Sequence, residues 1–291
     1  MKPLRRRLEE ARKNTGLLWE IIERDYILSW VLAGIGVNGK LQNELVFKGG
    51  TALKKCYFGE HRFSEDLDFT ARRSTPREDE LEEEIQRSCG LATELAQNFS
   101  PLELKVERYT EKEPHPGNQE AFTIKGKFPW HRQFLVRAMI EITVDEPIEI
   151  NPIKRKIIHG YGEKISQEVF VYSLEEIMAE KMRAILQHLQ KLEERGWSRS
   201  RARDYYDLWR ILNHHPEQLR IEILPSLFLK KCKVRKIDFD GPKEFFNKTL
   251  LDYIAKTWEQ WLGPLVPELP PFEPVIDNLK QKLFDLFKYT E

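Results

Sequence analysis

Between residues 47 and 69 the chain reads FKGGTALKKCYFGEHRFSEDLDF, and this stretch contains two features that carry chemistry. The apolar run that leads into Gly49-Gly50 predicts a buried strand. A helical pattern follows the glycines, and Thr51 is expected to cap that helix. Residues 66–69 then alternate acidic and apolar side chains, which predicts a second strand.

The glycine pair is suited to holding a phosphate. Glycines let the backbone approach an anion closely, and a helix N-terminus directs unpaired N–H groups and a positive dipole end towards it. Diglycine turns are common, and the GxxxxGK(S/T) pattern of a P-loop is missing, so this feature alone is weak evidence. The candidate nucleotide-binding residues at this turn are Lys48, Gly49, Gly50, Thr51 and Lys54.

Asp66 and Asp68 form the second feature. On a strand, residues two apart point to the same side, so both carboxylates would face one place while Leu67 packs into the core. Two like charges this close are unfavourable without a cation between them, and hard oxygen ligands suit Mg²⁺ or Mn²⁺. The alternative is a solvated edge strand with two exposed acids, which is the usual explanation of an isolated DxD pattern.

A third carboxylate on a neighbouring strand would complete a two-metal site. Glu141 is the first candidate because it is a lone acid in the apolar run at residues 138–143. Asp145 lies on the same side of that strand, near its end. Glu141 could instead form a structural salt bridge to Arg137. The identity of the third ligand therefore stays open.

Two charged residues fall on apolar faces of predicted helices. Lys181 lies on the buried stripe of its helix, three or four residues from Ile177 and Ile185. It must either extend its ammonium to solvent or meet an anion. Asp204 also lies on a partly buried face, where a basic partner is expected. A Lys181–Asp204 pair is compatible with the sequence, but spacing does not establish it.

The pattern of elements predicts an α+β protein with two domains. The first, over residues 1–168, combines helices and strands, and the second, over residues 169–291, is helical. The other expected elements are a helix over 4–32 ended by Gly34 and Gly36, a loop over 111–119, a strand over 134–144, helices over 173–192 and 200–212, a stiff spacer over 264–274 and a last helix over 275–287.

Composition limits the class of protein. The chain has 291 residues with 47 basic and 47 acidic side chains, so any nucleic-acid contact must come from a local basic patch. The candidates are residues 199–203 and 230–236, and each run could equally be solvated surface. Three cysteines without a CxxC pair indicate a reduced, cytoplasmic setting. No apolar run reaches the roughly 18–20 residues that cross a bilayer, so no membrane contact is expected.

These pieces, in this order, resemble the AbiEii/AbiGii-type toxin family of nucleotidyltransferase-like proteins from type IV toxin–antitoxin and abortive-infection systems. The resemblance extends to about residue 213. The matching text is Asp25-Tyr26, FKGGTALKK at residues 47–55, RFSEDLDF at residues 62–69, YSLEEIMAEKMRA at residues 172–184 and RDYYDLW at residues 203–209.

The resemblance implies a polymerase-β-like nucleotidyltransferase core with a helical C-terminal half. It implies metal binding by Asp66 and Asp68, an NTP substrate held at the glycine turn, and a place for Lys181 and Asp204 in the active site. Family members transfer nucleotides to the 3′ end of tRNA, which blocks aminoacylation and growth, and a cognate antitoxin is the expected partner. The acceptor hydroxyl would attack the α-phosphorus and expel pyrophosphate.

Two other functions are compatible with the sequence. The same chemistry could act on a small molecule or on a protein hydroxyl, and transfer would then be indifferent to added tRNA. A non-catalytic module could instead bind a nucleotide without turnover, although the intact acid pair counts against this function. The sequence does not indicate the preferred NTP, the acceptor or the identity of the antitoxin.

Overall fold

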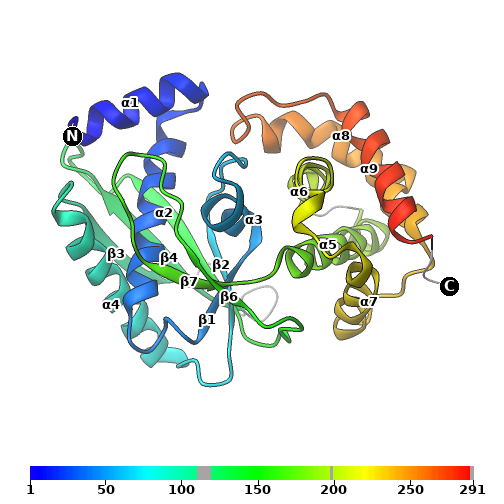
Figure 1. The fold of residues 1–291 in the computed structure, drawn as a ribbon, viewed down its shortest axis with the longest axis horizontal. Coiled ribbons are helices and arrows are strands. Elements are labelled where there is room, and N and C mark those ends of the chain that lie inside the picture. The colour runs from blue at the N-terminus through cyan, green and yellow to red at the C-terminus, as the bar shows by residue number, and fades with distance from the viewer. Residues whose placement is uncertain (110–118, 197–198, 289–291) are drawn as a thin grey trace. The chain divides into compact units, whose positions relative to one another are not determined.

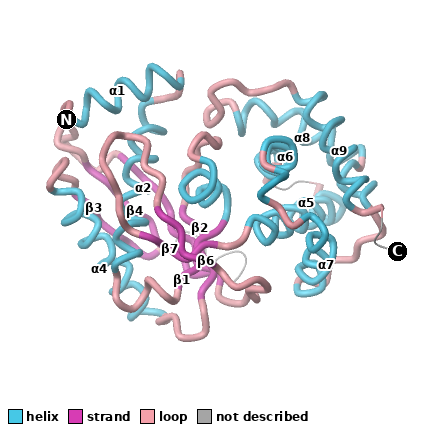
Figure 2. Tube along the Cα trace, viewed as in Figure 1, coloured by secondary structure: helices cyan, strands magenta, loops and turns pink. Residues whose placement is uncertain are grey.

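The computed structural model describes residues 1–109, 119–196 and 199–288 (Figure 1; Figure 2). The chain forms two compact units, Met1–Tyr172 and Ser173–Glu291. The first unit combines a sheet with helices, and the second contains helices (Figure 2). The expected α+β architecture with a helical C-terminal half is therefore confirmed.

The two units divide after Tyr172. The boundary expected between residues 168 and 169 falls at the start of a strand, Glu168–Val171, that belongs to the sheet of the first unit. The loop expected over residues 111–119 lies almost entirely outside the described residues.

The described part of the first unit contains a mixed sheet of seven strands in the order β3-β4-β5-β2-β1-β7-β6. The pairs β2–β5 and β1–β7 are parallel, and the other neighbours are antiparallel. The strands expected around residues 45–47, 66–69 and 134–144 are all present. The seven strands are β1 (Leu45–Lys48), β2 (Leu67–Ala71), β3 (Glu103–Arg108), β4 (Gln119–Lys127), β5 (Val136–Thr143), β6 (Ile153–Lys156) and β7 (Glu168–Val171).

Helices α1 (Leu4–Thr15), α2 (Trp19–Val37) and α4 (Glu78–Gln97) complete most of this unit. Two expectations about its first helices were wrong. The single N-terminal helix is two helices, because Gly16 ends α1 in a left-handed conformation. Gly34 and Gly36 do not end α2. A Cβ at Gly34 would overlap the backbone of α4, and one at Gly36 would overlap β7, so the glycines permit close packing.

The two faces of the sheet differ in character. A Cβ at Gly126 of β4 would overlap Ile27 of α2, so α2 covers the face to which Gly126 points. By cross-strand register and alternation, Phe69 shares this apolar face. Lys48 and Asp68 are paired positions that point to the opposite face. The polar side chains of the expected site therefore leave the sheet away from α2.

The helix after β1 begins earlier than expected. A short helix α3 (Gly49–Ala52) begins directly at the glycine pair and continues as a π-helix, η1 (Leu53–Phe58). Thr51 is inside α3 rather than at its N-cap, and its hydroxyl donates to the backbone carbonyl of Asp66. The expectation that Thr51 caps the helix was therefore wrong. Single π-turns of this kind are frequent at functional sites.

The second unit is built from helices joined by short connections. Ser173 caps α5 by accepting a hydrogen bond from the Glu176 N–H at 3.1 Å, as in a capping box. The last helix begins at Phe272, so it includes Pro274 in its first turn, where proline is tolerated, and the expected spacer is shorter. The helices are α5 (Leu174–Arg195), α6 (Ala202–His214), α7 (Leu224–Val234), α8 (Lys248–Leu262) and α9 (Phe272–Leu286), with 3₁₀ turns η2 (Pro216–Gln218), η3 (Ile221–Ile223) and η4 (Pro242–Phe246).

All three cysteine thiols are free and buried. Burial raises the pKa of Cys56 and of Cys89 to about 12, so both stay protonated and are poor nucleophiles. Across the described residues, none of the helices has the length and apolar character to span a membrane.

Candidate active site

One row of polar residues crosses three adjacent strands of the sheet. Lys48 of β1 is the register partner of Asp68 of β2, and Asp68 is in turn the partner of Glu141 of β5. Directly opposite residues point to the same side, so the three side chains leave one face together. Glu141 therefore neighbours the acid pair, whereas Asp145 is exposed and lies beyond the end of β5.

The acid pair is not on an edge strand. β2 lies between β5 and β1 inside the sheet, and Asp68 is half-buried, so the alternative of a solvated edge strand was wrong. Asp66 immediately precedes β2, and its Oδ1 accepts a hydrogen bond from the Met139 N–H at 3.2 Å. This bond anchors the Asp66 carboxylate to the neighbouring strand β5.

The glycine turn lies directly against two charged side chains. Gly49 has φ of 78°, which favours glycine, and a Cβ at this position would overlap the carboxylate of Asp68. A Cβ on Gly50 would overlap the guanidinium of Arg62. Arg62 is buried and donates to the Phe63 carbonyl at 3.1 Å. Arg62 therefore places a cation beside the turn, a position that the sequence did not predict.

The expected phosphate-binding lysines have different surroundings. The ammonium of Lys48 is 5.6 Å from the ring centre of Tyr172. Lys54 donates to the backbone carbonyls of Gly59 and His61 at 2.9 and 3.3 Å, and its ammonium lies 3.8 Å from the ring centre of Phe63. Burial lowers the pKa of Lys54 to about 8. Its contacts hold the end of the π-helix, and nucleotide binding by Lys54 stays a prediction.

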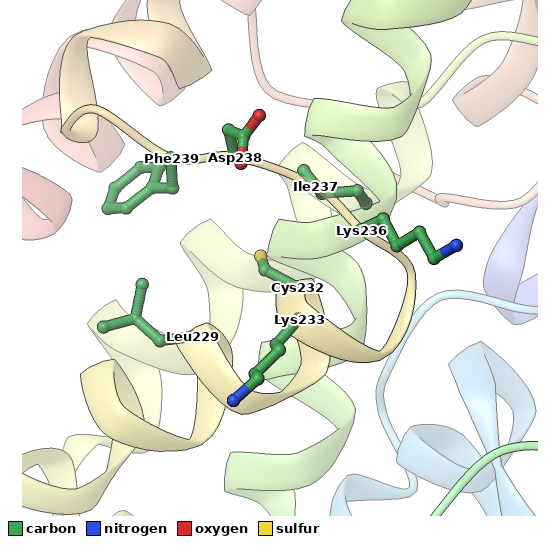
Figure 3. A pocket seen from close by; sticks show the side chains of 7 residues that line it. All are labelled: Leu229, Cys232, Lys233, Lys236, Ile237, Asp238 and Phe239. Carbon is green, nitrogen blue, oxygen red and sulfur yellow. The ribbon is translucent and has the colours of Figure 1, made fainter.

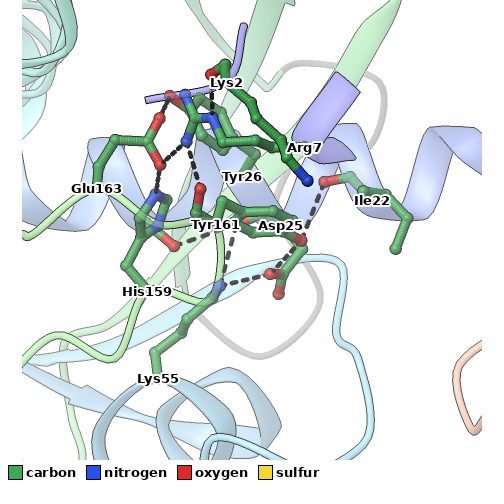
Figure 4. A network of polar contacts seen from close by, with 10 residues as sticks. Lys2, Arg7, Ile22, Asp25, Tyr26, Lys55, His159, Tyr161 and Glu163 are labelled. Carbon is green, nitrogen blue, oxygen red and sulfur yellow. Dashed lines mark hydrogen bonds and ion pairs between the residues drawn. The ribbon is translucent and has the colours of Figure 1, made fainter. Parts of the chain in front are cut away.

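A buried polar network joins the π-helix η1 to α2 (Figure 4). The Lys55 ammonium lies 2.7 Å from Oδ2 of Asp25 on α2, and the Tyr161 hydroxyl donates to the same oxygen at 2.8 Å. Both members of the Lys55–Asp25 ion pair are almost fully buried. Burial alone would raise the pKa of Asp25. The positive charges of Lys55 and Lys54 lower this pKa by more than burial raises it, so the net pKa is below its usual value.

The same network continues to the N-terminal helix through Glu163 (Figure 4). Glu163 accepts from the Tyr26 hydroxyl at 2.7 Å, lies 3.2 Å from His159 Nε2, and pairs with Arg7 of α1. The sequence indicated no role for Asp25 and Tyr26 beyond their place in the family resemblance. In the structure these two residues connect α2 to the segment beneath the glycine turn.

In the helical unit, Lys181 meets two carboxylates. Its ammonium is 2.9 Å from Oδ1 of Asp204 and 2.7 Å from Oδ2 of Asp207. Arg201 lies 3.4 Å from the second oxygen of Asp204. Burial pushes the pKa of Asp204 up, but Lys181 and Arg201 outweigh it, so the pKa is below its usual value. The Lys181–Asp204 pair thus exists, and Asp207 is a partner that sequence reasoning missed.

The basic run at residues 230–236 has fewer exposed cations for a nucleic-acid contact than its sequence suggested. Lys231 is fully buried and lies 2.8 Å from Glu176 and 3.4 Å from Glu180. Lys233 and Lys236 border a surface cavity of about 480 Å³ at the end of α7 (Figure 3). The lining of this cavity is Leu229, Cys232, Lys233, Lys236, Ile237, Asp238 and Phe239.

Residues 30–282 match the family described as nucleotidyl transferase AbiEii toxin, type IV toxin–antitoxin system. The chain belongs to this family. Its fold is similar to that of MenT4, a nucleotidyltransferase toxin from Mycobacterium tuberculosis H37Rv, with a TM-score of 0.62 and 17% sequence identity over 93% of this chain and 85% of that one. At this identity the likeness concerns the fold alone. No curated protein matches the chain.

The AbiEii family assignment confirms the resemblance seen in the sequence, and with it a nucleotidyltransferase-type toxin that has an antitoxin partner. The likeness to MenT4 confirms the expected fold. These comparisons concern the family and the fold.

The donor chemistry of this AbiEii-family site fits a hard divalent cation. Within residues 1–109, 119–196 and 199–288, no group of three or more His, Cys, Asp or Glu side chains is arranged to hold a metal ion. Mg²⁺ is usually held by one or two carboxylates together with substrate phosphates, rather than by a cage made only of protein. Asp66 and Asp68 beside the glycine turn match that pattern.

Proposed function

We propose that this AbiEii-family toxin is a metal-dependent nucleotidyltransferase that transfers nucleotides from an NTP to the 3′ end of tRNA, and so blocks translation and growth in the cytoplasm. One observation supports this most strongly. The register of three strands brings Lys48, Asp68 and Glu141 to one face, and the left-handed Gly49 backbone lies directly against Asp68. A phosphate chain and its counter-ion would both be accommodated there.

The residues of the first unit would bind and orient the triphosphate. The α3 N-terminus at Gly49 and Gly50 offers backbone N–H groups to phosphate oxygens, and Arg62 adds positive charge behind them. Asp66 and Asp68 would hold Mg²⁺ or Mn²⁺ together with the phosphates, and Glu141, the register partner of Asp68, would support them from the neighbouring strand. The ion when bound neutralises charge on the phosphates. Thr51 holds α3 to the acid pair through its bond to Asp66.

The reaction itself needs little covalent work from the protein. The acceptor hydroxyl oxygen forms a bond to the α-phosphorus, the bond from that phosphorus to the β-phosphate oxygen breaks, and pyrophosphate leaves as the hydroxyl loses its proton. Positioning and charge neutralisation supply most of the rate in such transfers. Lys181 would bind a phosphate or stabilise the developing negative charge, and Asp204 and Asp207 hold its ammonium in place.

The test is direct labelling. Purified protein would be incubated with each α-labelled NTP, Mg²⁺ and total tRNA, and we expect label in the tRNA with one or more nucleotides. Asp66→Ala and Asp68→Ala should abolish labelling and relieve growth inhibition, and chelation of the metal should do the same in the wild type. Full activity in either variant would remove the basis of the proposal.

The same experiment separates the two alternatives. Label in a small molecule or in a protein, with transfer unaffected by added tRNA, would show the same chemistry on another acceptor. Nucleotide binding without transfer to any acceptor would show a non-catalytic module. Restored growth on co-expression of a candidate protein would identify the cognate antitoxin.

A further inference from the structure

Two arginines surround one indole in the helical unit. Arg199 and Arg203 belong to the segment that enters α6, and Trp261 is in the last turn of α8. The guanidinium carbons of Arg199 and Arg203 lie 5.6 and 5.4 Å from the ring centre of Trp261. Arg199 is exposed and Trp261 is partly exposed, so the cluster reaches the surface. We call these three residues the arginine–indole platform.

The platform is fixed in place by hydrogen bonds at both ends of its segment. The hydroxyls of Ser200 and Thr257 are 2.7 Å apart, which joins the segment to the middle of α8. Arg203 Nε donates to the Trp261 carbonyl at 3.5 Å, and the Ala202 N–H donates to the Ser200 hydroxyl at 3.2 Å. A ligand that binds here would therefore meet side chains that are already ordered, which lowers the entropic cost of binding.

We propose that the arginine–indole platform binds the unpaired 3′ end of the acceptor RNA, an inference that rests on the function proposed above. Unpaired nucleotides are recognised by stacking of bases on aromatic rings or guanidinium planes and by cations against the phosphates. The platform combines both in three residues. An acidic peptide would need only the charges, so the partly exposed indole favours RNA over protein.

The position of the platform in the chain supports this ligand. Arg203 directly precedes Asp204, and Arg201 of the same segment contacts Asp204 at 3.4 Å. Asp204 in turn contacts Lys181, the residue proposed to act on a phosphate. An RNA end on the platform would therefore lie beside that cluster. The chain has no net charge, so an RNA contact has to be local.

The decisive variants separate stacking from charge. Trp261→Leu keeps both arginines and removes the ring, whereas Arg199→Gln removes one exposed charge and should not affect folding. Lys280→Gln is the matched control, because Lys280 is an exposed cation on α9. Circular dichroism would check that each variant is folded. The readouts are the KM for tRNA, the KM for NTP, and the anisotropy of a fluorescent single-stranded RNA bound to the intact protein.

We expect Trp261→Leu to raise the KM for tRNA and the Kd for the labelled RNA about tenfold or more, the effect of losing one stacked base. Arg199→Gln should weaken binding of both RNAs and reduce its dependence on salt. The KM for NTP should stay unchanged in both variants, and Lys280→Gln should match the wild type.

Three other outcomes would each be decisive. Wild-type transfer to tRNA with unchanged RNA binding in Trp261→Leu and Arg199→Gln would overturn the platform and leave the proposed function standing. RNA binding that depends on the platform without any transfer would retain the platform and reject the proposed function. Loss of binding in Arg199→Gln but not in Trp261→Leu would indicate a partner recognised by charge alone, and would also overturn the proposal.

Discussion

The ammonium of Lys181 lies between Asp204 and Asp207, at 2.9 and 2.7 Å from their carboxylate oxygens. The two acids are three residues apart on α6 and so share one helix face. They differ in burial, because the Asp207 side chain is fully buried while that of Asp204 is 13% exposed. We infer that Asp207 anchors the lysine from inside and Asp204 from the surface side.

This difference predicts that Asp207→Asn mainly lowers stability, whereas Asp204→Asn mainly lowers activity. Asp207→Asn should lower the free energy of unfolding by about 1–3 kcal/mol, because a buried charged hydrogen bond is weakened. Asp204→Asn should cost less, because its carboxylate is partly exposed and Asp207 still pairs with Lys181 in that variant. Urea unfolding measures both values, and the labelling assay should show a large loss of transfer in Asp204→Asn at nearly normal stability. A larger stability loss in Asp204→Asn would contradict the assignment.

The strand that carries Asp68 could be predicted because alternation on a strand is a local property. Asp66 and Asp68 needed only the period of two, and Glu141 needed only its isolation in an apolar run. The choice between Glu141 and Asp145 depended on strand register. Register is set by which strands pair, and a pattern within one strand does not contain that information. The structure pairs Glu141 with Asp68.

The register predicts that Glu141, and not Asp145, supports metal-dependent transfer. Glu141→Gln should lower activity by at least the roughly 10–100-fold that is lost when even an outer-shell partner of a metal is removed. It should also raise the Mg²⁺ concentration for half-maximal activity. Asp145→Asn removes an exposed acid beyond the strand end and should behave as wild type. Equal losses in the two variants would exclude a specific role for Glu141.

Gly49 offers a test of the turn itself. Gly49→Ala places a Cβ against the Asp68 carboxylate and forces alanine to adopt φ of 78°, a conformation that costs L-residues about 1–2 kcal/mol. We expect lower stability, a displaced Asp68 and a raised KM for NTP. Gly90→Ala is the control, because Gly90 lies within α4 and a Cβ there meets no other atom. This change should stabilise the helix by about 1 kcal/mol. Normal transfer by Gly49→Ala would rule out close approach at this glycine.

Other features of the structure were not predicted, mostly because they depend on tertiary contacts. Gly34 and Gly36 indicated a helix end, but close packing against α4 and β7 overrides their low helix propensity. Thr51 fitted an N-cap, but α3 already begins at Gly49, and the Thr51 hydroxyl donates to the Asp66 carbonyl instead. Arg62 begins the matching stretch at residues 62–69, but its contact with the glycine turn depends on the fold. Asp207 did have one, since it lies three residues from Asp204 on the same helix face.

The network around Glu163 predicts that the first unit loses stability in acid (Figure 4). Burial opposes ionisation of Glu163, but contacts with His159, Arg7 and Tyr26 lower its pKa from 4.5 to about 2. Between these values the unfolded state binds more protons, so the contribution to stability is complete above 4.5 and lost as pH falls to about 2. A shift of this size corresponds to roughly 3 kcal/mol.

His159 should add to the acid sensitivity at higher pH. Burial, assisted by Lys55, lowers its pKa from 6.5 despite the opposing effect of Glu163, so the folded state resists protonation and stability begins to fall below 6.5. We expect Glu163→Gln to be less stable than wild type at neutral pH, with the difference shrinking as pH falls from about 5 towards 3. Urea unfolding at a series of pH values measures this convergence. A difference that stays constant over this range would show that the Glu163 carboxylate is not held ionised by its partners.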